Sequence, residues 1–246
     1  EASDITIVDN SFSSISRAVM WGRSLYQNIQ RFILFQMTVN VAACLIVLIG
    51  AFVGTQSPLT VTQMLWVNLI MDTFAAMALA SLPPSHSVMS DKPRNRNAFI
   101  IDQPMAIRII GVGGFFFAIL TLLLFAFNHY EVNTLADILK PSALNTDGDL
   151  SEHELSLFFT IFVFLQFWNM FNARAFMTGK SGFALKGCSG FAFIALLIVI
   201  GQILIVSFGG EMFNVSPLSF INWITIIGST SLIAIIPELF RLVKGK

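Results

Sequence analysis

The sequence predicts an all-α integral membrane protein in which six helices cross the bilayer, preceded by a short soluble segment. Of its 246 residues, 55% are hydrophobic and only 11% are charged, whereas a soluble domain usually carries about 25% charged residues. Six apolar stretches are each long enough to cross a hydrocarbon core of about 30 Å, which takes about 20 helical residues. The formal net charge is zero, which argues against a nucleic-acid partner.

The N-terminal region combines a predicted strand with a long helix. The segment "DITIVD" (4–9) alternates apolar and polar residues as a strand does, and we assign residues 1–14 to the edge of a soluble domain. Residues 15–53 are expected to form one helix, because no polar break separates their first half from the apolar stretch 31–53. Such a rod would run from solvent into the membrane.

The remaining spans follow from apolar stretches between polar segments. The second span is expected at 59–81, next to the first, because only the short turn "GTQSP" joins them. A polar loop at 82–103 leads to the third span. The last four spans are predicted at 104–128, 155–176, 188–209 and 217–240.

The long acidic loop 129–154 contains a weak calcium-loop pattern. In "ALNTDGDLSEHE" the acidic and amide residues follow EF-hand spacing, but Ala143 stands where the first ligand is expected. A simpler interpretation is that Ser151 caps the next helix and Glu154 closes a capping box.

Basic residues predict the orientation. When the spans alternate, only Lys140 falls on one side of the membrane. The other thirteen of the fourteen basic residues fall on the opposite side: Arg17, Arg23, Arg31, Lys92, Arg94, Arg96, Arg108, Arg174, Lys180, Lys186, Arg241, Lys244 and Lys246. By the positive-inside rule that side is cytoplasmic, so both termini are expected in the cytoplasm.

One acid, Asp72, lies at mid-depth in the predicted spans, within "LWVNLIMDTFAAMALA". An Asp at the bilayer centre costs about 3 kcal/mol on insertion scales, so a compensating cation or proton is expected. Asn68 precedes it by four residues, and a regular helix would put both on one face. Asn40 lies on the neighbouring first span. We therefore predict a metal site formed by Asn40, Asn68 and Asp72.

Carboxylate and amide oxygens favour Ca²⁺, which takes six to eight oxygen ligands. The three residues supply about four oxygens, so the site is incomplete without backbone carbonyls, water or another helix. Mn²⁺ also takes oxygen ligands and remains an alternative. Other intramembrane amides, Gln36 on the first span and Gln166, Asn169 and Asn172 on the fourth, are interpreted as hydrogen-bonded bridges between helices.

The segments "EASDITIVDNSFSSISRAVMWGRSLYQNIQRFILFQMTVNVAA" and "PLTVTQMLWVNLIMDTFAAMALASLPP" resemble the C-terminal membrane half of P-type calcium ATPases. The plasma-membrane, calmodulin-regulated type and its bacterial relatives are most similar. The likeness is dense up to Ile101 and thinner beyond it. It implies that residues 1–14 belong to the phosphorylation domain and that the six spans correspond to helices five to ten of a pump. It also implies that Asn40, Asn68 and Asp72 bind the transported ion.

Two replacements imply one calcium per cycle. The resemblance places Ala43 where two-ion pumps have a helix-five glutamate, and Met71 where they have a helix-six threonine. Leu82 stands where relatives often carry an acid, which leaves one loop contact uncertain. Once the ion is released, low dielectric would favour the neutral form of Asp72, so H⁺ counter-transport is expected.

The resemblance also implies partners that this sequence lacks. The phosphorylation motif, the nucleotide-binding and actuator domains, and helices one to four with their glutamate ligand are missing, so we expect no catalytic residue here and no ATPase activity from the chain alone. ATP and Mg²⁺ would act in the intact pump, in the plasma (cell inner) membrane. No basic amphipathic tail follows Arg241, which favours a bacterial or shortened pump.

Two other classes remain open. A self-contained channel or secondary transporter would show an inverted repeat, yet the three candidate ligands have no counterparts in the last three spans. A purely structural membrane module would need a partner that neutralises Asp72; no intramembrane Lys or Arg is available for this, although a proton could serve.

Overall fold

The computed structural model describes the chain except residues 1–5, 7, 10, 54–57, 96, 139–143, 145–149, 179–180 and 245–246; at 53, 242 and 244 only the backbone is described. Half of the predicted strand at 4–9, residues 4, 5 and 7, lies outside the described residues. The described residues form helices and no strand; a single bridge pairs Tyr130 with Leu144.

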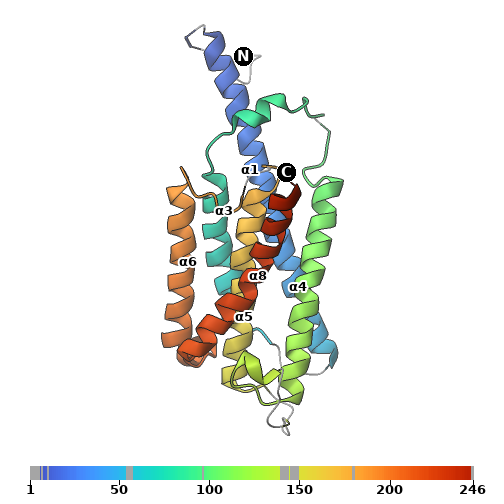
Figure 1. Cartoon of the computed structure of the whole chain (residues 1–246), viewed down its shortest axis with the longest axis vertical. Coiled ribbons are helices and arrows are strands. Elements are labelled where there is room, and N and C mark those ends of the chain that lie inside the picture. Colours follow the sequence, from blue (N-terminus) through green and yellow to red (C-terminus); the bar gives the residue numbers. More distant parts are fainter. Residues whose placement is uncertain are drawn as a thin grey trace.

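Within the described residues, six helices are long and apolar enough to cross a membrane: Phe12–Phe52, Val61–Ala80, Gln103–His129, Glu152–Ala175, Ser189–Phe208 and Phe220–Arg241. Their ends agree with the predicted spans to within a few residues, apart from the first helix, which extends far beyond 31–53. The all-α membrane fold is therefore confirmed. The helices stand side by side in one bundle (Figure 1).

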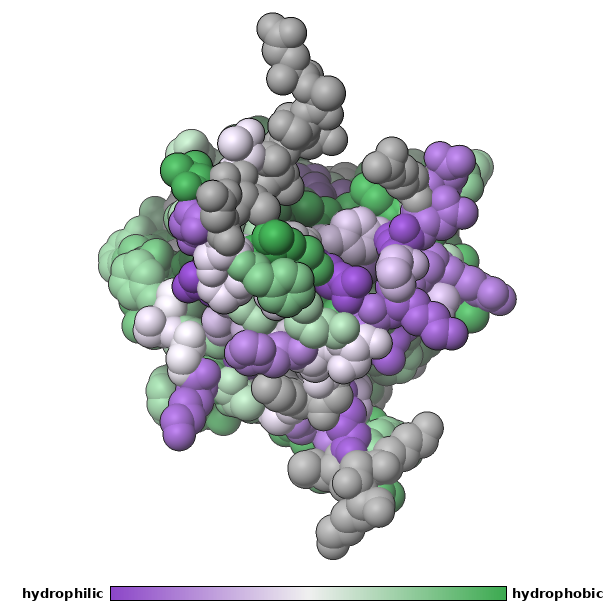
Figure 2. Space-filling view, turned by 90° about the horizontal axis from the view of Figure 1, so that it is seen from above, coloured by the Kyte–Doolittle hydropathy of each residue, from purple (hydrophilic) through white to green (hydrophobic). Residues whose placement is uncertain are grey.

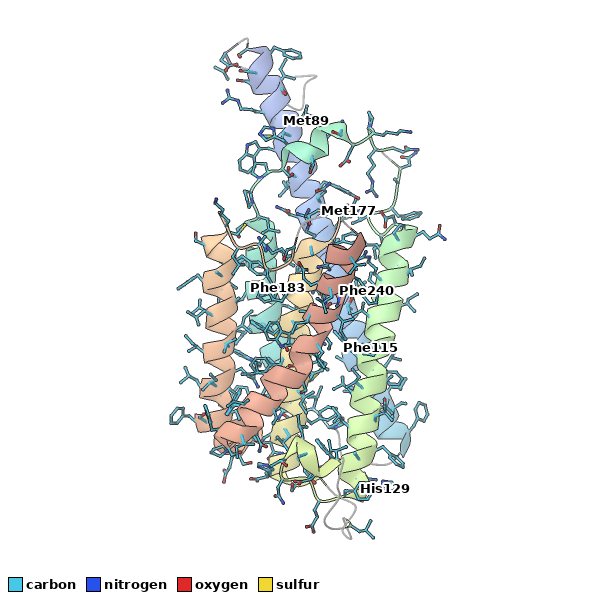
Figure 3. The ribbon with its side chains drawn as sticks, in the orientation of Figure 1. Met89, Phe115, His129, Met177, Phe183 and Phe240 are labelled. Atoms are coloured by element: carbon cyan, nitrogen blue, oxygen red, sulfur yellow. The ribbon has the colours of Figure 1, made fainter. Side chains whose placement is uncertain are left out.

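Helix α1, Phe12–Val53, is one continuous helix of 42 residues. It projects beyond the other spans at the end of the molecule where both termini lie (Figure 1). The predicted continuous rod is confirmed, although it begins at Phe12 rather than 15. Met89 marks this end and His129 the opposite one (Figure 3).

The second span is made of three segments rather than one regular helix. Helix α2, Val61–Leu65, starts at a capping box formed by Thr60 and Gln63. A π-helix, η1, follows at Trp66–Met71, and α3 continues from Asp72 to Ala80.

The loop after α3 is fastened along α1. It contains a short 3₁₀-helix, η2, at His86–Ser90. Arg23 of α1 donates hydrogen bonds to the carbonyls of Val88 and Asp91, both at 2.9 Å. Asn28 donates to the carbonyl of Leu82 at 3.0 Å, so that loop position is held through its backbone.

Helix α4, Gln103–His129, begins where Asp102 accepts a hydrogen bond from the backbone N–H of Met105 at 2.9 Å. It packs closely on α1: a Cβ atom added at Gly113 would lie 3.3 Å from Val41. Beyond α4, the outer loop contains a 3₁₀-helix, η3, at Leu135–Ile138.

Helix α5, Glu152–Ala175, is the central helix: 94% of an 18-residue apolar stretch within it is buried. It contacts α1, α4, α6 and α8. The predicted capping box is confirmed, since Ser151 and Glu154 each satisfy the other's backbone N–H. Glu154 also accepts from the N–H of Val132 at 3.1 Å, which ties the outer loop to this helix.

The last helices complete the bundle. Helix α6, Ser189–Phe208, packs on α3, and the short α7, Gly210–Phe213, leads to α8, Phe220–Lys244. Helix α8 crosses α5 obliquely (Figure 1). Near its end Arg241 donates to Glu238 at 2.6 Å, as expected for a charge pair at a helix end.

Candidate cation site

Asp72 is buried without a partner. Its side chain is 3% exposed, and neither carboxylate oxygen makes a hydrogen bond within the described part of the chain. Burying a carboxylate is costly unless a cation, a proton or several donors compensate it. The acid expected at mid-depth in the second span is thus buried, and its oxygens are free to bind a cation or a proton that the described residues do not provide.

The π-helix ends at this carboxylate. The backbone N–H of Asp72 donates to the carbonyl of Val67, five residues earlier, which is the π-helical pattern. Just after it, the Thr73 hydroxyl donates to the carbonyl of Leu69. Single π-helical turns inside α-helices occur often at functional sites. The wide turn marks the position at which the second span departs from regular helix geometry.

The regular α-helix expected between Asn68 and Asp72 is replaced by a π-helical turn. The helix is not α-helical between them, and the two side chains differ in burial: Asn68 is exposed, whereas Asp72 is buried. Asn40 of α1 is half-buried. No hydrogen bond joins the three side chains to one another in the structure as described. They occupy three elements, α1, η1 and α3, and α3 contacts both of the others.

Amides on α5 divide into two groups. Asn172 donates to the carbonyl of Ile233 on α8 at 2.8 Å, so the predicted bridging role is confirmed there. Gln166 is fully buried, yet neither atom of its amide has a hydrogen-bond partner among the described residues. The bridging interpretation is wrong for Gln166. An unpaired buried amide has a free carbonyl oxygen, and no signal in the sequence distinguishes Gln166 from Asn172.

The described residues contain no group of three or more His, Cys, Asp or Glu side chains that could hold a metal ion. Asp72 therefore does not belong to such a cluster in this part of the chain. Any hard cation bound there would need amide or carbonyl oxygens, and further ligands from outside the described residues.

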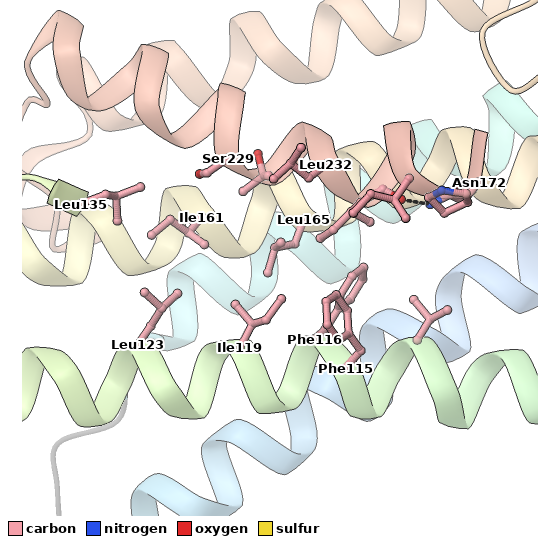
Figure 4. Close-up of a pocket in the computed structure, with 15 residues that line it drawn as sticks. Phe115, Phe116, Ile119, Leu123, Leu135, Ile161, Leu165, Asn172, Ser229 and Leu232 are labelled. Atoms are coloured by element: carbon pink, nitrogen blue, oxygen red, sulfur yellow. Dashed lines mark hydrogen bonds between the residues drawn. The ribbon is translucent and has the colours of Figure 1, made fainter. Parts of the chain in front are cut away.

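A separate hollow of about 510 Å³ lies between α4, α5 and α8 (Figure 4). Its walls are largely apolar, including Phe116, Leu165 and Leu232. Its polar residues are already engaged: Thr230 donates to the carbonyl of Ile226 at 2.6 Å, and Asn172 bridges to α8. This hollow does not include Asp72 and has no charged ligand for a cation.

The start of the π-helix is supported by α6. The indole N–H of Trp66 donates to Gln202 at 3.2 Å, and both side chains are buried. A Cβ atom added at Gly201 would lie 2.7 Å from the Trp66 ring. Only glycine leaves room for this ring.

We expect Gly201→Ala to lower the free energy of unfolding by about 1–3 kcal/mol, the usual cost of overpacking, by pushing Trp66 away from α6. Thermal unfolding in detergent would measure it. Gly228→Ala on α8 is the control, because nothing lies within 4 Å of its added Cβ. Equal effects from both variants would contradict the proposed Trp66 contact.

Comparison with known proteins matches this chain to the membrane region of cation-transporting ATPases. Residues 56–243 match the family model described as cation transporting ATPase, C-terminus. The chain is 40% identical over 224 residues to plasma membrane calcium-transporting ATPase 2 of Oreochromis mossambicus, covering 91% of this chain and 20% of the relative. It is also 40% identical to the human plasma membrane calcium-transporting ATPases 1 and 3, over 225 and 228 residues, covering 91% of this chain and 18% of each relative.

The chain spans about a fifth of the length of these relatives. The matched region contains five of the six long helices and includes the π-helix and Asp72. With its six apolar helices and this match over most of its length, the chain belongs to the family of cation-transporting ATPase C-terminal regions.

Proposed function

We propose that this chain forms the cation path of an ATP-driven pump that moves Ca²⁺ out of the cytoplasm across the plasma membrane. The observation that carries the proposal is the buried carboxylate of Asp72, whose two oxygens have no partner in the described structure. Ionisable groups inside membrane spans are expensive and usually mark ion pathways. The relatives are calcium-transporting ATPases by name, which favours Ca²⁺ over Mn²⁺ as the transported ion.

The exposed side of the π-helix suggests where further ligands would come from. Asn68 is exposed beside Leu69 and Ile70, whose side chains are 64% and 39% exposed. In a longer pump this face would be covered by another helix, which would add oxygens to those of Asn40, Asn68 and Asp72. The phosphorylation and nucleotide domains, with ATP and Mg²⁺, would belong to that additional part, and α1 would transmit their movement.

Two buried apolar residues support the transport of a single ion. Ala43 is 1% exposed and Met71 is fully buried, and these are the positions where the resemblance places ligands of a second calcium. Neither side chain offers an oxygen. When the single ion leaves, Asp72 would again be an uncompensated buried charge, and a proton would neutralise it. The proposed cycle therefore exchanges one Ca²⁺ for H⁺.

Sealed membrane vesicles containing the intact pump would test this proposal. We expect ATP-dependent uptake of one Ca²⁺ per ATP hydrolysed, measured with a radioactive tracer and phosphate release, together with proton movement in the opposite direction. Mn²⁺ in excess should compete only weakly. A ratio of two Ca²⁺ per ATP would refute the single-ion argument, and ATP-independent uptake would favour a channel.

A further inference from the structure

A second polar site lies at the end of the bundle that carries the termini. It is a cavity of about 430 Å³ bounded by α1, the loop after α3, the end of α5 and the segment that leads to α6. Its walls include Arg31, Arg174, Lys186, His86 and Ser181, but not Asp72. Figure 2 looks onto this end of the molecule, where hydrophilic side chains spread across the face.

Arg31 extends from α1 into this cavity and is 5% exposed. Its Nε donates to the carbonyl of Phe176 at 3.1 Å. Its two other nitrogens donate to Asn28 Oδ1 at 2.5 Å and to Gln27 Oε1 at 3.1 Å. All three acceptors are neutral, and two of the five donors of this guanidinium remain unused.

Arg174, at the end of α5, is 8% exposed. It donates to the carbonyls of Gly182 and Ala184, both at 2.6 Å, and to Cys188 Sγ at 3.3 Å. Its buried Nε has no partner in the part of the chain that the structure describes. This second guanidinium is therefore also bonded only to neutral groups, with an unpaired N–H in a buried position.

The acids near this cavity are engaged elsewhere. Glu238 pairs with Arg241 and accepts from the N–H of Gly182 at 3.3 Å. Asp91 accepts from Gln27 at 3.1 Å. Carbonyls and amides orient a guanidinium, but they do not neutralise its charge.

The two buried guanidinium groups also repel each other. A buried charge without a counter-charge is strongly unfavourable. An anion bound between Arg31 and Arg174 would neutralise these charges.

We propose that this cavity is an anion site that binds a phosphate group through Arg31, Arg174 and Lys186. Guanidinium groups bind planar pairs of oxygens on carboxylates and phosphates. A single carboxylate would offset only one of the three positive charges, whereas a phosphate monoester carries close to two negative charges. The phosphate would come from free phosphate or from a lipid headgroup. Bound there, it would connect α1 to the ends of α5 and α6.

Cys188 provides a reporter inside the site, because it lines the cavity and contacts Arg174. We would express the full chain with Cys44→Ser, so that Cys188 is the one remaining cysteine, and measure its modification by N-ethylmaleimide in a phosphate-free maltoside detergent. One arm adds inorganic phosphate at constant ionic strength, set with chloride. Another adds phosphatidic acid, with phosphatidylcholine as its comparison.

The proposal predicts that the modification rate falls about tenfold when the phosphate compound is present at ten times its dissociation constant. Protection by inorganic phosphate would identify a free-anion site. Protection by phosphatidic acid alone would identify a headgroup site. No protection in either arm would overturn the proposal and leave a carboxylate from another part of a longer protein as the counter-charge.

Variants separate specific binding from general attraction. Lys186→Gln should weaken protection about threefold to fivefold, as expected for a charge at the solvent edge. Arg31→Lys should weaken it more, because the charge is kept but the paired donors are lost. Lys92→Gln removes an exposed charge outside this cavity and should change nothing. Equal effects of Lys92→Gln and Lys186→Gln would overturn the proposal, once thermal unfolding shows that all variants are folded.

Discussion

Replacing Asp72 by asparagine in the intact pump is expected to abolish calcium-dependent phosphorylation by ATP and calcium uptake. The substitution keeps the size of the side chain and removes its negative charge. Interactions with a charged partner are worth about 1.5–3 kcal/mol, or roughly 10- to 100-fold in affinity. The loss should be larger here, because both oxygens of this carboxylate are buried and have no hydrogen-bond partner among the described residues. Phosphorylation assayed against free Ca²⁺ would measure it.

The thermal stability of the Asp72→Asn variant should not fall with its activity. In the ion-free protein Asp72 has no hydrogen-bond partner among the described residues. Asp72→Asn therefore removes an uncompensated buried charge without breaking a hydrogen bond. We expect the thermal midpoint to stay the same or rise, as is common when functional sites are neutralised. Proton counter-transport should disappear with the carboxylate.

Glu211→Gln offers a matched control, since Glu211 is an exposed acid on α7. It should leave phosphorylation, uptake and stability unchanged. A calcium dependence that survives Asp72→Asn would remove Asp72 from the ion path. A large fall in the thermal midpoint would instead show that the carboxylate has a structural partner.

The sequence was sufficient to predict the number and position of the spans. Lipid requires about 20 apolar helical residues for each crossing, and this requirement leaves a strong signal even without knowledge of packing. The ends were predictable where a capping residue acts locally, as Ser151 does before α5. The single long α1 was predictable because no polar break interrupts it.

The local geometry of the site could not be predicted in the same way. The sequence around "LWVNLIM" is as apolar as that of a regular helix, so nothing in it distinguishes a π-turn from an α-turn. Asp72 could be placed inside a span from the apolar residues around it, whereas the exposure of Asn68 depends on which neighbouring elements cover that face. Likewise, Arg31 and Arg174 were assigned to one side of the membrane, but their burial around one cavity depends on tertiary packing.

Deleting Leu69 from the π-helix tests whether this wide turn is what makes the site. A π-turn behaves as one extra residue inserted into an α-helix, so the deletion should give a continuous α-helix while α2 and α3 keep their orientation. We expect calcium uptake by the intact pump to be lost, because the oxygens around Asp72 shift. The thermal midpoint should hold or increase, because a poorly bonded turn is replaced by a regular one.

The matched control is deletion of Leu196 from α6. Both leucines are exposed, Leu69 by 64% and Leu196 by 56%, but α6 is regularly helical at this position. There the deletion rotates every later residue by about 100°, which moves Gln202 away from Trp66 and should lower the midpoint. If deletion of Leu69 lowers the midpoint as much as deletion of Leu196, the π-turn is required by the fold. If deletion of Leu69 leaves calcium uptake intact, the cation path does not depend on the π-turn. Only the combination of lost transport with retained stability identifies the π-turn as a feature kept for ion binding, at some expense in helix stability.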